Sequence, residues 1–170
     1  LWEQMLDKRY SVLCFRDNTQ ETGYSGTLFY NSTERKAILA NRGTDGLFTN
    51  DSAANSSIAA GNVPAEQFRS MVEFITDCQN IYNEYLSEFD VAGHSLGGCL
   101  AQIAKATYPS EVRDVYTYNA PGAQYLAQSF TIETTSATPG KLIVTDGNSS
   151  YLWDTHVWDK YLSFFQNRVG

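Results

Sequence analysis

The region from Lys36 to Asn119 alternates short β-prone segments with helical patterns, and this alternation constrains the fold more than any other feature of the sequence. The β-prone residues form three runs, at 36–41, 90–92 and 112–119. Between them, apolar residues recur at spacings of three and four, the period of an amphipathic helix, over 65–85 and 96–107. Strands that alternate with helices favour a parallel sheet covered on both faces.

The flanking residues predict a hairpin, a loop and the ends of the two helices. A polar turn at 31–34 separates Gly26–Phe29 from 36–41, which predicts two hairpin strands. Residues 46–63 are polar and small with no clear period, which predicts a loop. Pro64 favours a helix start, and Pro109 favours a helix end just before it. With 170 residues and no Pro-rich or Gly/Ser-rich linker, residues 1–170 are expected to form a single domain.

Charge and cysteine usage exclude several classes of protein. The formal charge of −7 repels phosphate backbones, so we expect no nucleic-acid partner. No apolar run approaches the roughly 18 residues that span a bilayer, and no signal peptide opens the chain, which begins at Leu1. The location stays open between a secreted and a bacterial effector-like protein. The three cysteines lack metal-ligand spacing, so we expect buried thiols and no metal or cofactor.

The run Gly93-His94-Ser95-Leu96-Gly97 identifies Ser95 as a candidate nucleophile. It fits GxSxG, in which a serine on a tight strand-to-helix turn projects its hydroxyl from the sheet. A predicted strand ends at Gly93 and a predicted helix follows Ser95, and the start of that helix brings N–H groups toward developing negative charge. We expect Ser95 to attack the substrate and the Leu96 N–H to donate to the oxyanion. The alternative is a glycine-rich turn between ordinary elements.

A second oxyanion donor is expected from the turn that follows 36–41. Arg42-Gly43-Thr44 lies there, and Thr44 offers both its N–H and its hydroxyl. The alternative is an ordinary polar turn in which Arg42 pairs with Asp45.

These segments together resemble the class 3 lipase-like family of α/β hydrolases, including its phospholipase-like bacterial members. The matching motifs are Thr22-Gly23-Tyr24, Arg42-Gly43-Thr44, the run 93–98, Leu100-Ala101-Gln102 and Tyr118-Asn119-Ala120-Pro121-Gly122. The resemblance implies an α/β-hydrolase fold, a compact three-layer sandwich with a mostly parallel central sheet. It also implies hydrolysis of carboxylic esters in lipids, with Ser95 as the nucleophile and Thr44 as the oxyanion residue.

His156 is the candidate general base, which a serine nucleophile requires. The chain has two histidines. His94 is adjacent to Ser95 on the turn and points in another direction, so we expect it to pack locally. His156 lies C-terminal to Ser95, as the order nucleophile, acid, histidine requires. The alternative is a surface histidine ahead of a helix at 157–165.

Asp146 is the first choice for the acid, because 141–146 reads as a strand that ends in a carboxylate. Asp146-Gly147-Asn148 is also a strong hairpin turn signal, which gives Asp146 a structural role as the alternative. Only 61 positions separate Ser95 from His156, a short span beside the family pattern, so either the region after Gly122 is compact or the segment that bears the usual acid is missing. Among the other carboxylates, Asp154 is too close in sequence to His156 for good geometry, and Asp114 begins its strand, at the wrong end. Glu133 is an alternative that could end another strand, at 130–134.

The expected function is that of a serine esterase, a lipase or phospholipase that works through an acyl-enzyme. The expected partner is a lipid or other acyl-ester substrate, with transient contact with a membrane surface. A thioesterase, acyltransferase or peptidase could use the same residues, and an inactive hydrolase-like binding module is the alternative from another class.

Two further segments are candidates for substrate contact. The predicted loop 46–63 could close as a lid, with apolar contacts to an acyl chain from Leu47, Phe48 and Ile58; an ordinary surface loop is the alternative. Aromatic residues around His156 could line an acyl pocket or belong to the core: Tyr151, Trp153 and Trp158.

Overall fold

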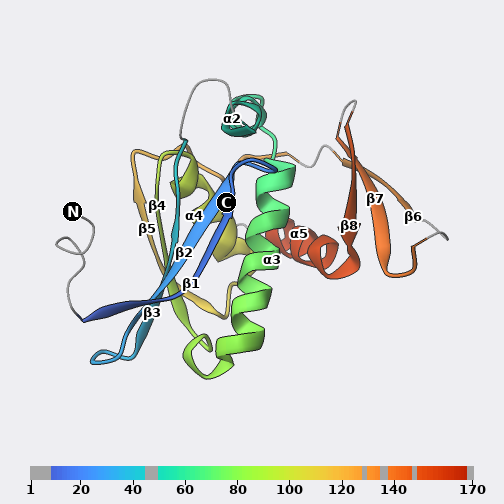
Figure 1. The fold of residues 1–170 in the computed structure, drawn as a ribbon. Helices are drawn as coiled ribbons and strands as arrows, with labels where there is room; N and C mark the ends of the chain where they lie inside the picture. The colour runs from blue at the N-terminus through green and yellow to red at the C-terminus, as the bar shows by residue number, and fades with distance from the viewer. Residues whose placement is uncertain (1–8, 45–49, 128–129, 135–137, 147–148, 168–170) are drawn as a thin grey trace.

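The structure of the chain, a computed structural model, contains one mixed five-stranded sheet and a separate three-stranded antiparallel sheet (Figure 1). It describes residues 9–44, 50–127, 130–134, 138–146 and 149–167. The strands are β1 (Tyr10–Asn18), β2 (Tyr24–Asn31), β3 (Lys36–Asn41), β4 (Phe89–His94), β5 (Val112–Tyr118), β6 (Phe130–Thr134), β7 (Lys141–Asp146) and β8 (Ser149–Asp154). The helices are α2 (Asn50–Ala59), α3 (Ala65–Tyr82), the 3₁₀ turn η1 (Asn83–Tyr85), α4 (Leu96–Thr107) and α5 (Thr155–Asn167).

The predicted mostly parallel α/β-hydrolase sheet is wrong. The strand order is β1-β2-β3-β4-β5, and only β3, β4 and β5 run parallel. β1 pairs with β2, and β2 with β3, in antiparallel fashion. Parallel neighbours need a crossover of a dozen or more residues, which the helical segments supply only between β3 and β5. The short turns after β1 and β2 can only reverse the chain, so those pairs are antiparallel.

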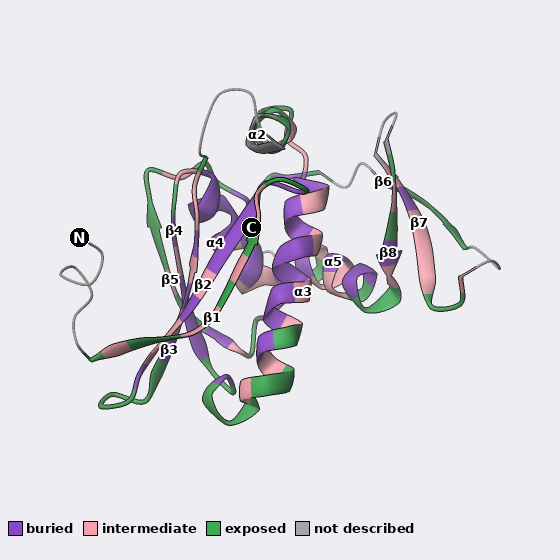
Figure 2. Cartoon of the chain, in the orientation of Figure 1, coloured by how far each residue is buried: buried purple, intermediate pink, exposed green. Residues whose placement is uncertain are grey.

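The predicted three-layer sandwich is also wrong, because α3 and α4 pack on the same face of the sheet (Figure 1). Crossovers between parallel strands are right-handed, so two successive crossovers in one direction put both helices on one face. Leu28, Leu39 and Val91 share that face by their register and are buried. The opposite face carries side chains that no described helix covers: Phe15 is 63% exposed and Tyr118 is 62% exposed. Figure 2 shows that most of β5 is exposed.

Most of the local predictions between β2 and β5 are confirmed. The hairpin of β2 and β3 forms as expected, and α4 spans Leu96–Thr107 as the spacing predicts. The loop prediction is wrong for residues 50–59, which form α2. That helix is rich in Asn and Ser and has no apolar stripe, so its sequence carries no helical period. Residues 46–49 of the predicted loop, with Leu47 and Phe48 of the candidate lid, lie outside the described residues.

The three-stranded sheet of β6, β7 and β8 is attached to the rest of the molecule through its inner face. Val144 and Trp153 point from that face and are fully buried. The ring of Trp153 stacks on Phe68 of α3 at 6.0 Å and meets Tyr161 of α5 edge-on at 5.7 Å. The links within this sheet are short, so its strands are antiparallel and do not extend the main sheet beside β5.

Candidate active site

Ser95 is the single residue between β4 and α4, and its backbone conformation is strained. Its φ of 53° and ψ of −124° fall in a region that residues with a side chain rarely adopt. Such strain costs about 1–3 kcal/mol and persists only where the surroundings enforce it. The Ser95 N–H donates to the carbonyl of Tyr118 at 2.9 Å, and the Ser95 carbonyl accepts from the N–H of Gly98 at 2.9 Å. β5 and α4 therefore hold the turn from both sides.

The glycines on either side of Ser95 allow backbones to approach that a side chain would separate. A Cβ at Gly93 would lie 2.2 Å from the carbonyl of Gly97. A Cβ at Gly97 would lie 2.3 Å from the carbonyl oxygen of Asn41 and 2.7 Å from that of Arg42. The first turn of α4 thus packs directly against the chain where β3 ends.

That packing places Arg42-Gly43-Thr44 beside the nucleophile turn, as the oxyanion prediction requires. A Cβ at Gly43 would come within 2.7 Å of the carbonyl oxygen of His94. The N–H of Leu96 opens α4, where the first backbone donors have no acceptor within the helix and the helix dipole favours negative charge. The turn that carries Thr44 therefore lies against His94, the residue before Ser95, and Leu96 follows Ser95 at the start of α4. Asp45, the alternative partner of Arg42, lies outside the described residues.

Asn55 of α2 is a site residue that the sequence did not indicate. Its side-chain amide donates a hydrogen bond to the hydroxyl oxygen of Thr44 at 2.9 Å. Because this hydroxyl accepts from Asn55, its own hydrogen stays available to donate to a substrate oxygen. Asn55 falls in the segment predicted as a loop, so no spacing rule relates it to Thr44.

The structure does not bring His156 to Ser95. His156 is an exposed residue in the first turn of α5 and lines a cavity of about 240 Å³ that Arg16 also lines. Arg16 is in register with Gly26, Asn41 and Gly93 across four strands, so its backbone lies roughly 14 Å from the nucleophile strand, at about 4.8 Å per strand. No hydrogen bond joins Ser95 to His156, both of which are described.

Buried residues before and after His156 in the sequence fix its position. Trp153 and Val157 are fully buried. Trp153 and Trp158 thus belong to the core and not to an acyl pocket, the two possibilities that the sequence left open for them. The other imidazole, His94, is exposed at the end of β4 and is in register with Tyr118, on the sheet face opposite α3.

The candidate acids are dispersed. Asp146 ends β7 and is in register with Ser149 at the start of β8, so the two strands form the antiparallel pair that the predicted hairpin requires; the side chain of Asp146 lies outside the described residues. Asp154 pairs with Lys141 at 2.9 Å and lines the same cavity as His156. Glu133 and Asp114 are exposed on β6 and β5. No carboxylate among the described residues is hydrogen-bonded to His156.

No protein-family model matches the sequence, and a search of curated proteins finds no significant match. Among the described residues, no cluster of His, Cys, Asp and Glu could hold a metal ion. None of the described helices is both long enough and apolar enough to cross a membrane.

Proposed function

We propose that the chain is a serine hydrolase that cleaves carboxylic esters, with Ser95 as the nucleophile. The observation that carries the proposal is the strained Ser95 turn packed against Arg42-Gly43-Thr44. A strained serine between a strand and a helix, beside converging backbone donors, is the arrangement that acyl transfer needs. The resemblance of the same motifs to class 3 lipases supports lipid esters as the substrate, as in a lipase or phospholipase.

In the proposed reaction, the Ser95 hydroxyl attacks the ester carbonyl and forms an acyl-enzyme that water then hydrolyses. The N–H of Leu96 and the N–H and hydroxyl of Thr44 stabilise the oxyanion. Removal of one such donor from comparable sites lowers kcat by about 10²–10³. An oxyanion hole with substrate binding alone retains about 10³–10⁴-fold catalysis over water, so the site supports slow ester cleavage even without a base at Ser95.

We propose His156 as the general base, on chain order and on the lack of another imidazole besides His94. This assignment requires the first turn of α5 to approach Ser95 in the active form, because His156 lines a cavity with Arg16 of β1, and β1 lies three strands from β4. General-base catalysis contributes about 10²–10⁴-fold. The rate of the wild type relative to a His156→Gln variant therefore tests this assignment apart from the nucleophile.

The experiment combines a fluorophosphonate probe, which reacts with activated serines, with p-nitrophenyl butyrate hydrolysis. We expect the wild type and Ser87→Ala, a control at an exposed turn serine, to be labelled and active. Ser95→Ala should not be labelled and should retain only the slow cleavage that the oxyanion hole supports. Thr44→Val should lose about 10²–10³-fold in kcat, and Thr44→Ser should lose little. Equal labelling of Ser95→Ala and the wild type would rule out Ser95 as the nucleophile.

Two further comparisons define the substrate and the base. Ester, thioester and amide substrates of equal chain length distinguish an esterase from a thioesterase or peptidase, and we expect the ester to be cleaved fastest. His156→Gln should lower kcat by at least about 10²-fold. An unchanged rate in His156→Gln would remove His156 from the mechanism and leave Ser95 with its oxyanion hole.

The distance between His156 and Ser95 favours a second candidate, a catalytically inactive module that binds acyl ligands at the Ser95 turn. The same experiment separates the two. A wild-type protein that is not labelled and cleaves no ester, yet binds a non-hydrolysable acyl phosphonate monoester more tightly than Thr44→Val does, would support the binding module.

A further inference from the structure

Two of the three cysteines face each other where β1 packs against α3. Cys14 is in register with Leu28, on the sheet face that α3 covers, and it is half-buried. Cys78 lies on α3 and is 3% exposed. Both line one cavity of about 330 Å³ between β1 and the second half of α3. Besides burial, the neighbouring Cys14 thiol raises the pKa of the Cys78 thiol, as expected of two groups that share this cavity.

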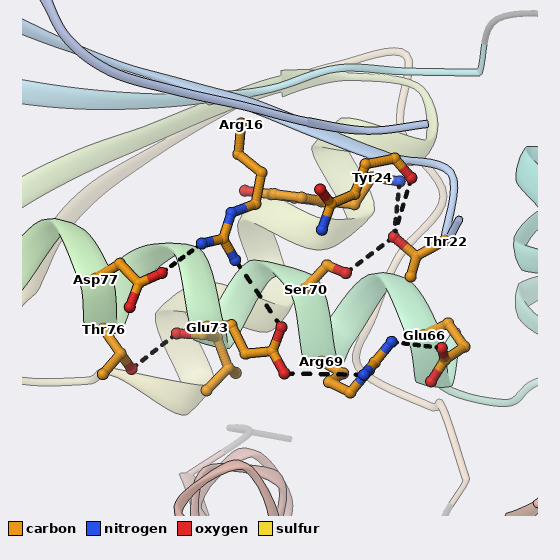
Figure 3. Close-up of polar contacts among 11 residues, drawn as sticks. Arg16, Thr22, Tyr24, Glu66, Arg69, Ser70, Glu73, Thr76 and Asp77 are labelled. Atoms are coloured by element: carbon orange, nitrogen blue, oxygen red, sulfur yellow. Dashed lines mark hydrogen bonds and ion pairs between the residues drawn. The ribbon is translucent and has the colours of Figure 1, made fainter. Parts of the chain in front are cut away.

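Polar contacts on both sides of this pair fix β1 against α3. Arg16, two residues after Cys14, hydrogen-bonds to Asp77, and Figure 3 shows its guanidinium between Asp77 and Glu73. On the other side, the hydroxyl of Tyr82 donates to the carbonyl of Leu13 at 3.1 Å. The thiol pair lies between these two cross-links, so the strand cannot slide along the helix without breaking one of them.

We propose that Cys14 and Cys78 form a reversible disulfide by exchange with a low-molecular-weight disulfide such as oxidised glutathione. The thiolate of Cys14 attacks one sulfur of oxidised glutathione, which breaks its S–S bond, forms a mixed disulfide and releases one glutathione thiolate. Cys78 then gives up its proton and attacks the sulfur of Cys14, and the second glutathione thiolate leaves. Two protein thiols are oxidised and one external disulfide is reduced to two thiols.

Exposure assigns these roles to the two cysteines. Cys14 is the half-buried member and faces the cavity, so it can meet a small disulfide. Burial raises the pKa of the Cys78 thiol well above its usual range, with the neighbouring Cys14 adding to the shift, so Cys78 attacks only after Cys14 has reacted. Cys99 is fully buried in α4 and does not line the cavity that Cys14 and Cys78 share, so this cavity gives a small disulfide no access to it. We therefore expect Cys99 to stay reduced.

The disulfide would link residues 64 positions apart and join the edge strand β1 to α3, which contributes Phe68, Met71 and Val72 to the core. Closing a loop of that length constrains the unfolded chain strongly. For a chain of this size the expected rise in Tm is on the order of 10 °C. The link would also keep β1 and α3 together when the Arg16–Asp77 pair is screened by salt.

The test treats the folded protein with oxidised glutathione, then denatures it, alkylates the remaining free thiols and maps the peptides by mass spectrometry. We expect one free thiol, at Cys99, a Cys14–Cys78 peptide that has lost two hydrogen atoms, and the rise in Tm. The control Cys99→Ser should form the same link. Cys78→Ser should stop at a Cys14–glutathione mixed disulfide, and Cys78→Ala repeats this arm if the serine variant does not fold.

Three outcomes would overturn the proposal. One is a wild type that keeps Cys14 as a mixed disulfide with glutathione and never links it to Cys78. Another is a wild type in which all three thiols stay free while Cys78→Ser accepts glutathione at Cys14. The last is a cross-link that involves Cys99. None of these readouts depends on hydrolase activity.

Discussion

Gly97→Ala should damage the oxyanion hole more than it damages the fold. The added Cβ would lie 2.3 Å from the carbonyl oxygen of Asn41 and 2.7 Å from that of Arg42, against an ordinary contact distance of at least 3.4 Å. The first turn of α4 and the chain at Arg42 must therefore separate by about 1 Å, because both sides of the contact are backbone. A misplacement of that size at a catalytic site costs about 10²-fold in rate.

The expected change in the free energy of unfolding is the balance of two effects. Overpacking costs about 1–3 kcal/mol, and replacing glycine by alanine in a helix gains up to about 1 kcal/mol. The steric cost is the larger, because the clashing atoms at Asn41 and Arg42 are main-chain carbonyls that no side-chain rotation can move. Gly97→Ala should thus lose about 1–2 kcal/mol by urea unfolding, while kcat for p-nitrophenyl butyrate falls by about 10²-fold.

Gly122→Ala is the matched control, since no heavy atom lies within 4 Å of its added Cβ. It should keep the wild-type rate and gain up to about 1 kcal/mol through the unfolded state. If Gly97→Ala unfolds at the wild-type urea midpoint and keeps the wild-type rate, the close packing of α4 against the chain after β3 is refuted. If the wild type itself is inactive, the urea unfolding of both variants still tests that packing.

Three other predictions follow from single contacts. Asn55→Ala should lower kcat by about 2–10-fold, which corresponds to the free energy of one hydrogen bond, because the hydroxyl of Thr44 is then no longer held in place. A kcat equal to that of the wild type would show that this bond does not orient Thr44. Burial raises the pKa of Glu66, against the opposing effects of its cationic and hydrogen-bonding neighbours, so the folded chain binds this proton more tightly than the unfolded chain does. The free energy of unfolding should therefore fall as the pH rises from about 4.3 through the raised pKa. Urea unfolding at a series of pH values should show that Glu66→Gln removes this fall. The same pH dependence in the wild type and in Glu66→Gln would contradict the prediction. Trp153→Ala should cost about 3–5 kcal/mol in urea unfolding and the 45% exposed Leu152→Ala less than about 0.5 kcal/mol, and similar losses would show that Trp153 does not attach the small sheet.

The elements predicted correctly are those whose signals are local. α4 is bounded by the Ser95 turn and by Pro109, and the periodic apolar residues of α3 follow Pro64, so both helices could be located from spacing alone. The hairpin at residues 31–34 has its own turn chemistry: the side-chain oxygen of Asn31 accepts from the N–H groups of Thr33 and Glu34. Signals of this kind need no knowledge of the rest of the fold.

The elements missed are those defined by distant partners. α2 has no apolar stripe, and its buried Ala54 and its contact with Thr44 exist only because the chain returns there. β1 was not predicted as a strand, and its pairing with β2 makes the sheet mixed. The pairing of Cys14 with Cys78 likewise depends on β1 meeting α3, and counting three cysteines gave no sign of it.

The sequence by itself determined the Ser95 turn: its glycines, the strand before it and the helix after it follow from residues within about 20 positions. The tertiary structure alone decided what surrounds that turn. It put the Arg42-Gly43-Thr44 turn against His94 and the first turn of α4, with Asn55 bonded to Thr44, and it put His156 in a cavity that Arg16 also lines. The physical reason is that periodicity and turn chemistry act along a few residues, whereas the place of His156 is fixed by burial of Trp153 against α3 and α5, a choice among packings that only the whole chain can make.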